Sequence, residues 1–89
     1  MNSYMVTYRL NAPGQDYEEL HEAIKSYPAY AKCLNATWIV QTNKSASDVR
    51  DDLIEDTDYN DELLVTKLSG PAAWYGLSDD ISDWIHENM

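Results

Sequence analysis

The chain has 89 residues and a net charge of −10, from sixteen acidic and six basic side chains. Its length fits one small domain, near the size at which a single core gives only modest stability unless an oligomer adds to it. A hydrophobic fraction of 44%, with three Trp and seven Tyr, argues against disorder. The acidic balance disfavours nonspecific binding to nucleic acid or to membranes.

No apolar run approaches the roughly 20 residues that cross a bilayer, and residues 1–5 lack the basic start and apolar centre of a signal peptide. We therefore expect a cytoplasmic protein. Cys33 is the single cysteine, so no internal disulfide, C-x-x-C motif or cysteine zinc site is expected. The sequence instead predicts a small, buried apolar role for this side chain.

Alternating side chains predict a first strand over residues 4–10, which stops at the turn-forming sequence Asn-Ala-Pro-Gly. Apolar residues at helical spacing predict an amphipathic helix over 16–27, ended by Pro28. Residues 29–42 have the composition of a β-hairpin, interrupted by the Asn35-Ala36 pair.

In the second half, Ser45 followed three residues later by Asp48 is typical of a helix start, and predicts a helix to about residue 55. A last strand follows over 63–68. Gly70-Pro71 predicts a short helical turn as far as residue 74, and Ser78 is expected to cap a closing helix.

This order of strand, helix, strand, strand, helix, strand is the split β-α-β pattern of ferredoxin-like domains, an α+β fold. We expect one domain over residues 1–89. Residues 1–69 would form a four-stranded antiparallel sheet, covered on one face by two helices, with the first and third strands at its centre. Residues 70–89 would form a C-terminal helical extension.

The second face of that sheet is expected to be open and rich in apolar side chains. Such a surface exceeds what solubility favours, so it predicts a homodimer, with packing of the closing helix as the competing explanation. Lys67 and Gln41 are expected on the same face. The residues predicted at the dimer interface are Met5, Thr7, Arg9, Ile39, Leu63 and Val65.

The exit of the first strand is the strongest candidate binding site. Arg9 and Lys67 would lie on neighbouring strands and give a local positive spot, suited to a phosphate or a carboxylate. The alternative is that Arg9 compensates acids from a partner chain. Among the aromatic residues, Trp38 and Trp84 fit core positions, whereas Tyr75 is freer to contact a ligand. The predicted binding residues are Arg9, Asn11, Lys67 and Tyr75, next to the Pro13-Gly14 turn.

Other patterns give no support for catalysis or for a metal. Asp56-x-Asp58-x-Asn60 imitates the start of an EF-hand loop, but Asp61 stands where that loop needs Gly and Lys67 where it needs Glu. His21 and His86 lack a second ligand at a useful spacing, and surface or boundary roles are expected for both. No G-x-S-x-G elbow, P-loop or Rossmann glycine motif occurs.

Three stretches resemble a family of short bacterial and phage proteins labelled SinR-like, over nearly the whole chain: YRLNAPGQDY at 8–17, TWIV at 37–40 and GPAAWYGLSDDISDW at 70–84. The architecture is more distantly similar to the small CRISPR-associated endoribonucleases, which serve as dimeric adaptors in spacer integration, and to virulence-associated protein D. In those dimers the first strand ends in a Tyr-Asp pair whose Asp is linked to a divalent metal. The resemblance places Tyr8-Arg9 at that position, where the guanidinium of Arg9 cannot bind a cation.

The sequence therefore predicts a non-catalytic, homodimeric binding or regulatory protein that needs no cofactor. One alternative is a Mg²⁺-dependent endoribonuclease in which Asp16, or a carboxylate of a partner chain, replaces the missing Asp. Another is an acidic inhibitor, of phage or host origin, that imitates nucleic-acid charge and occupies a basic groove on a protein partner. Its acidic surface would comprise Asp48, Asp51, Asp52 and Asp56.

Overall fold

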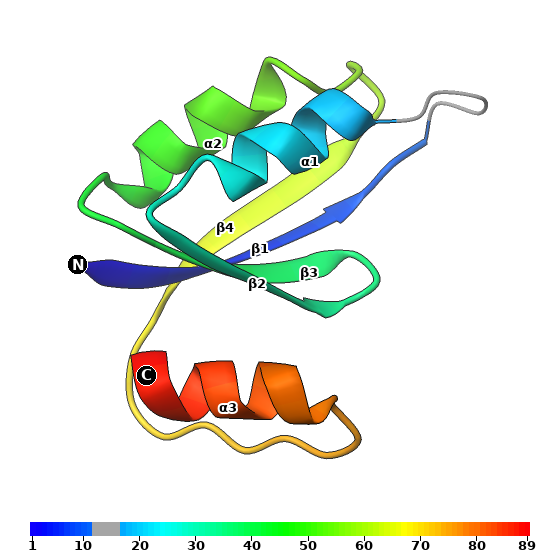
Figure 1. Cartoon of the computed structure of the whole chain (residues 1–89). Coiled ribbons are helices and arrows are strands. Elements are labelled where there is room, and N and C mark those ends of the chain that lie inside the picture. The colour runs from blue at the N-terminus through cyan, green and yellow to red at the C-terminus, as the bar shows by residue number, and fades with distance from the viewer. Residues whose placement is uncertain (12–16) are drawn as a thin grey trace.

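The computed structural model describes residues 1–11 and 17–89, and shows a four-stranded antiparallel sheet between helices (Figure 1). Its order of elements and the sheet order β2-β3-β1-β4 confirm the predicted α+β, ferredoxin-like fold with β1 and β3 at the centre. None of the described helices has the length and apolar character needed to cross a membrane. The elements are β1 (Asn2–Arg9), α1 (Glu18–Lys25), β2 (Ala29–Leu34), β3 (Thr37–Thr42), α2 (Ala46–Ile54), β4 (Glu62–Leu68) and α3 (Asp79–Asn88).

Helices α1 and α2 cover one face of the sheet, and the main core lies beneath them (Figure 1). The prediction that Trp38 and Val40 point into this core is confirmed, because both are buried in its cluster. Side chains with almost no exposed surface come from both helices and from both central strands. These are Leu20, Ile24, Val49, Leu53, Val6 and Val40.

The helix starts follow local capping chemistry. The hydroxyl of Ser45 accepts a hydrogen bond from the backbone N–H of Asp48 at 3.1 Å, and the hydroxyl of Ser78 accepts one from Ile81 at 3.3 Å. Both predicted caps are therefore confirmed. Helix α1 is shorter than expected and begins after Tyr17, whose φ of 52° and ψ of 21° are left-handed. That conformation is costly for a bulky residue, and it ends the helical path there.

Helix α3 packs on the second face of the sheet, opposite α1 and α2 (Figure 1). Ile85 of α3 and Ile39 of β3 are both buried. The side chain of Gln41 donates a hydrogen bond of 2.7 Å to the backbone oxygen of Asn88. The second face is therefore not fully open as predicted: α3 covers its β2–β3 side, which was the competing explanation for its apolar residues.

Residues 69–77, which we call the connecting segment, lead from β4 to α3 without a helical turn, so the turn predicted at 70–74 is wrong. Gly70 and Gly76 bend this segment with φ values of +85° and +80°, a region in which glycine is favoured over other residues. Because Gly70 takes this conformation just before Pro71, the segment turns away instead of starting a helix.

The side chains of β4 lie on the opposite faces from those predicted. Leu63 and Val65 pack against the core cluster under α1 and α2, where they oppose Tyr8 and Val6 of β1. Leu64 opposes Thr7 and lies on the second face. Apolar residues occupy both alternating sets of β4, so alternation alone did not distinguish its two faces. Leu63 and Val65 are thus corrected from the open face to the core.

Candidate functional site

Arg9, at the end of β1, is paired with Glu62 at the start of β4. The guanidinium Nε is 2.8 Å from Glu62 Oε1, and Nη2 is 2.9 Å from Oε2, which is a two-bond contact. The hydrogen bond and the charge of Arg9 hold the pKa of the Glu62 carboxyl below its usual range, and Glu62 raises the pKa of Arg9 in the same way. The compensating acid thus comes from the same chain.

Lys67 does not join Arg9. It opposes Tyr4 on β1, whose ring is buried in the core under α1 and α2, whereas Arg9 opposes Glu62 on the second face. The two cations therefore lie on opposite faces of the sheet. The predicted positive spot is wrong, because its second cation is absent and its first is neutralised by Glu62.

Asn11 ties the exit of β1 to the chain just before β4. Its backbone N–H donates to Asp61 Oδ1 at 2.7 Å, and its side-chain amide donates to the backbone oxygen of Asn60 at 2.9 Å. The Asp61 carboxylate also accepts from the hydroxyl of Tyr17 at 2.9 Å and from the backbone N–H of Asp58 at 2.7 Å. Asp61 is therefore a structural hub that joins the exit of β1 and the start of α1 to the turn before β4.

Asp61 stands where an EF-hand loop needs Gly, and in this fold its carboxylate has a structural role instead. The oxygens of Asp61 accept hydrogen bonds from the protein, so they do not present a free ligand set. Desolvation raises the pKa of Asp61, but the hydrogen bonds from Asn11, Asp58 and Tyr17 outweigh it and lower the pKa overall. Within residues 1–11 and 17–89 no group of three or more His, Cys, Asp or Glu could hold a metal ion. Pro13, Gly14 and Asp16 lie outside the described residues.

A hydrogen-bonded chain that the sequence analysis missed joins a tryptophan, a tyrosine and a histidine. The indole Nε1–H of Trp38 donates to the hydroxyl of Tyr8 at 3.0 Å, and that hydroxyl is 3.4 Å from Nε2 of His21. The ring of His21 is also 6.1 Å from the ring of Trp38. The alternation of β1 and the apolar stripe of α1 placed Tyr8 and His21 beside the core, which is the signal that could have found this contact.

The predicted acidic surface on α2 is already partly paired. Nζ of Lys44 is 2.7 Å from Asp52 Oδ2, and the hydroxyl of Tyr27 donates to the same oxygen at 3.0 Å. The hydrogen bond from Lys44 is the main reason that the pKa of Asp52 is lowered. Asp51 is paired with Arg50 at 2.9 Å. These contacts reduce the negative charge that α2 presents.

Part of the second sheet face is left uncovered by α3. Leu64 is 56% exposed and Leu34 is 60% exposed. Thr7 on β1 and Thr37 on β3 lie between these two leucines, which are on the outer strands β4 and β2. The two threonine hydroxyls are 3.2 Å apart. The Arg9–Glu62 pair borders this surface, and its two charges cancel. We call this surface the neutral patch; it comprises Thr7, Leu34, Thr37, Leu64, Arg9 and Glu62.

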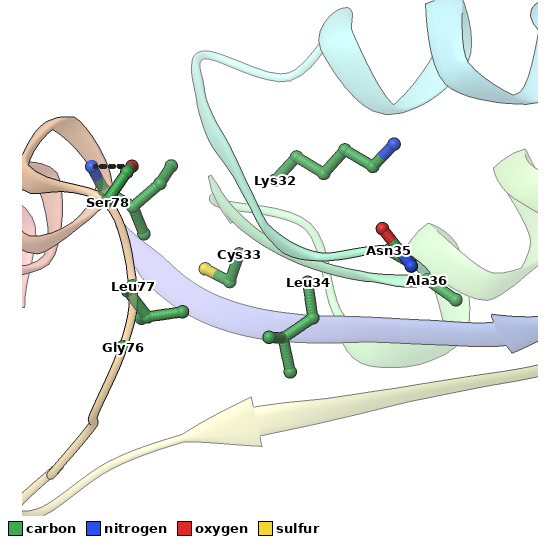
Figure 2. Close-up of a pocket in the computed structure, with 9 residues that line it drawn as sticks. Lys32, Cys33, Leu34, Asn35, Ala36, Gly76, Leu77 and Ser78 are labelled. Atoms are coloured by element: carbon green, nitrogen blue, oxygen red, sulfur yellow. Dashed lines mark hydrogen bonds between the residues drawn. The ribbon is translucent and has the colours of Figure 1, made fainter.

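A hollow of about 750 Å³ lies between the β2–β3 turn and the start of α3 (Figure 2). In Figure 2 the side chain of Leu77 points toward Cys33 and Leu34, whereas Lys32 extends away from Leu77. Nζ of Lys32 lies 5.8 Å from the centroid of the Trp38 ring on the other face of the sheet. Lys32 lines the hollow, but its cation is turned toward Trp38, and Leu77 places an apolar side chain between the connecting segment and β2.

Tyr75 is 98% exposed on the connecting segment, and its role in contacting a ligand stays a prediction. Trp74, by contrast, is held against α3. Its indole Nε1–H donates to the hydroxyl of Ser82 at 3.1 Å, and its ring meets the ring of His86 edge-on with centroids 5.0 Å apart. The exposed His86 thus has a packing role.

Comparison with known proteins gives no match: no protein-family model, no curated protein and no solved structure matches the chain.

Proposed function

We propose that this chain is a non-catalytic binding protein that acts as a homodimer and pairs through the neutral patch. The observation that carries the proposal is the two-bond contact between Arg9 and Glu62. It fills the end of β1, the position at which the resemblance to the CRISPR-associated endoribonucleases implies a metal-linked carboxylate. A guanidinium that is already bound to a carboxylate offers no ligand to a cation.

The charge of the chain favours the neutral patch as the place where two copies meet. Each copy carries a net charge of −10, so most contacts between copies bring like charges together. Around Leu34 and Leu64 the nearest ion pair cancels, and the contact would cover two exposed leucines from each copy. A symmetric contact of this kind removes apolar surface from water without burying an unpaired charge.

The interface proposed here differs from the one that the sequence suggested. Met5, Thr7 and Arg9 stay on the second face, so they remain available to it. Ile39 lies on that face but is buried, and Leu63 and Val65 belong to the core. Leu34 and Leu64 take the place of these three residues.

Light scattering coupled to size-exclusion chromatography tests the dimer. We expect a dimer at micromolar concentration that tightens as salt rises, because salt screens the repulsion between two acidic chains. A monomer at all salt concentrations would refute the pairing.

Incubation with RNA and with DNA, in Mg²⁺, in Mn²⁺ and in chelator, tests the absence of catalysis. We expect no cleavage in any of these conditions. Chelator-sensitive cleavage that disappears in an Asp16→Asn variant would instead establish the nuclease alternative, with Asp16 as the replacement carboxylate. Chelator-sensitive cleavage that survives this substitution would also refute the proposal, with a carboxylate of the partner chain as the replacement.

A further inference from the structure

An apolar pocket of about 420 Å³ lies between the second sheet face, the connecting segment and α3. It is distinct from the Arg9–Glu62 pair, neither member of which lines it. Its walls come from every strand of the sheet and from both C-terminal elements. The lining residues are Met5, Cys33, Leu34, Thr37, Ile39, Leu68, Ser69, Gly70, Pro71, Ala72, Ala73, Trp74, Tyr75, Leu77, Ile85 and Met89.

The lining side chains carry no charge. Charged residues make up 25% of the chain, yet none of the sixteen described residues around the pocket is Asp, Glu, Lys, Arg or His. A charged ligand would lose its hydration here without meeting an opposite charge, which is costly. The lining therefore selects against ions and favours a neutral ligand.

Local contacts keep the pocket open. The hydrogen bond from Trp74 to Ser82 and the contact with His86 fasten the middle of the connecting segment to α3. The segment bends at Gly70 and Gly76, and the residues that follow Pro71 toward the pocket are Ala72 and Ala73. Small side chains on a fastened segment leave space that larger ones would fill.

The size of the space fits a small molecule. Ligand pockets in proteins commonly measure about 300–1,000 Å³. Water would occupy the same space as about 14 molecules, at roughly 30 Å³ each, next to walls that offer few hydrogen-bonding partners. An apolar molecule that displaces this water binds favourably, because its own apolar surface is removed from the solvent.

We propose that this pocket binds a neutral, chiefly apolar small molecule with a short aliphatic chain or an aromatic ring and at most one or two hydrogen-bonding groups. The hydroxyls of Thr37, Ser69 and Tyr75 are among the polar side-chain groups on the strand and segment walls that can receive such a group. The inference rests on the proposed function in that the chain is a binding protein, and it does not require the dimer.

The probe is N-phenyl-1-naphthylamine, a neutral aromatic molecule whose fluorescence increases in apolar surroundings. We expect saturable binding to the full chain at one site per chain. Competition with 1-octanol and with octanoate, which share a carbon chain and differ in charge, tests selectivity. We expect octanol to displace the probe and octanoate to be at least tenfold weaker. Shortening octanol to 1-hexanol removes two CH₂ groups and should weaken competition about tenfold.

Ala73→Phe tests the location, because Ala73 lines the pocket and a larger side chain there reduces the space. The matched control is Ser47→Phe, which adds the same side chain at an exposed position of α2. We expect probe affinity to fall at least tenfold in the first variant and to stay within twofold in the second. Alkylation of Cys33, which lines the pocket, gives a readout on the unaltered chain: octanol should slow it and octanoate should not.

Absence of saturable probe binding, equal competition by octanol and octanoate, or Cys33 alkylation that octanol leaves unchanged would each overturn the inference. If Ala73→Phe fails to fold, as judged by circular dichroism, the alkylation result decides. The oligomeric state is measured on the same samples. A monomer that binds the probe with octanol selectivity refutes the proposed dimer and supports the pocket, whereas a dimer without such binding does the reverse.

Discussion

Leu63 and Leu64 are adjacent on β4, yet the structure gives them different neighbours. Leu63 packs against the core under α1 and α2, and Leu64 lies 56% exposed on the neutral patch. Replacing each in turn by Ala therefore separates the stability of the domain from the association of two copies. The two substitutions remove the same atoms, so each serves as the control for the other.

The size of each effect follows from burial. Fully burying a leucine side chain contributes about 2 kcal/mol, so covering the exposed 56% of Leu64 contributes about 1 kcal/mol per copy. A symmetric dimer loses this twice, so Leu64→Ala should weaken it by about 2 kcal/mol, or about thirtyfold in Kd. Leu63→Ala removes partly buried packing and should cost about 1–2 kcal/mol of folding stability.

Sedimentation equilibrium measures the dimer Kd, and thermal melting of dilute monomer measures stability. In a domain of this length, 1 kcal/mol corresponds to about 4–8 °C in Tm. We expect Leu64→Ala to leave the Tm of the monomer unchanged and to raise the dimer Kd. We expect Leu63→Ala to lower the Tm and to leave the dimer Kd of the folded chain unchanged. The opposite pattern would show that the faces of β4 are reversed and would refute pairing through the neutral patch.

Three further predictions concern charge and backbone. Although desolvation opposes it, hydrogen bonding holds the pKa of Asp61 below its usual value, so its contribution is present above about pH 4 and is lost as the pH falls through the folded-state pKa. Asp61→Asn should therefore lower the Tm at neutral pH, and its difference from the unaltered chain should shrink in acid; a constant difference would contradict this. Gly76→Ala should lower the free energy of unfolding, measured by urea denaturation, by about 1 kcal/mol, because φ is +80° at this position. A steric clash is not the cause, since a Cβ there would meet no atom within 4 Å. Arg9→Ala leaves the charge of Glu62 unpaired on the neutral patch and should weaken the dimer most at low salt. The double variant Arg9→Ala/Glu62→Gln should recover the dimer. Equal dimer Kd values for the single and the double variant at low salt would exclude the role of charge cancellation.

Local chemistry made much of the fold predictable. The alternation in β1, the break at Asn35-Ala36 and the caps at Ser45 and Ser78 act over a few residues, and each appears where the sequence placed it. The order of elements then left few arrangements of the sheet, because ferredoxin-like connections place β1 beside both β3 and β4.

Contacts between distant residues were the ones that sequence reasoning did not reach. Glu62 is 53 residues from Arg9, and no local pattern connects the two. The run Leu63-Leu64-Val65 is apolar on both faces, so the face of each residue depends on its register with β1. The sequence left two explanations for the apolar second face, a second copy of the chain and packing of the closing helix, and no local pattern decided between them.

The Asp61 hub has a consequence for the kinetics of folding. Its carboxylate bonds to Asn11 and Tyr17, which precede it by 50 and 44 residues, so we expect these bonds to form only after β1 and β4 have met. Interactions absent from the transition state slow unfolding and leave the folding rate almost unchanged. We therefore expect the Asp61 hub to lower the unfolding rate, and so to lengthen the lifetime of the folded state, with little effect on the folding rate.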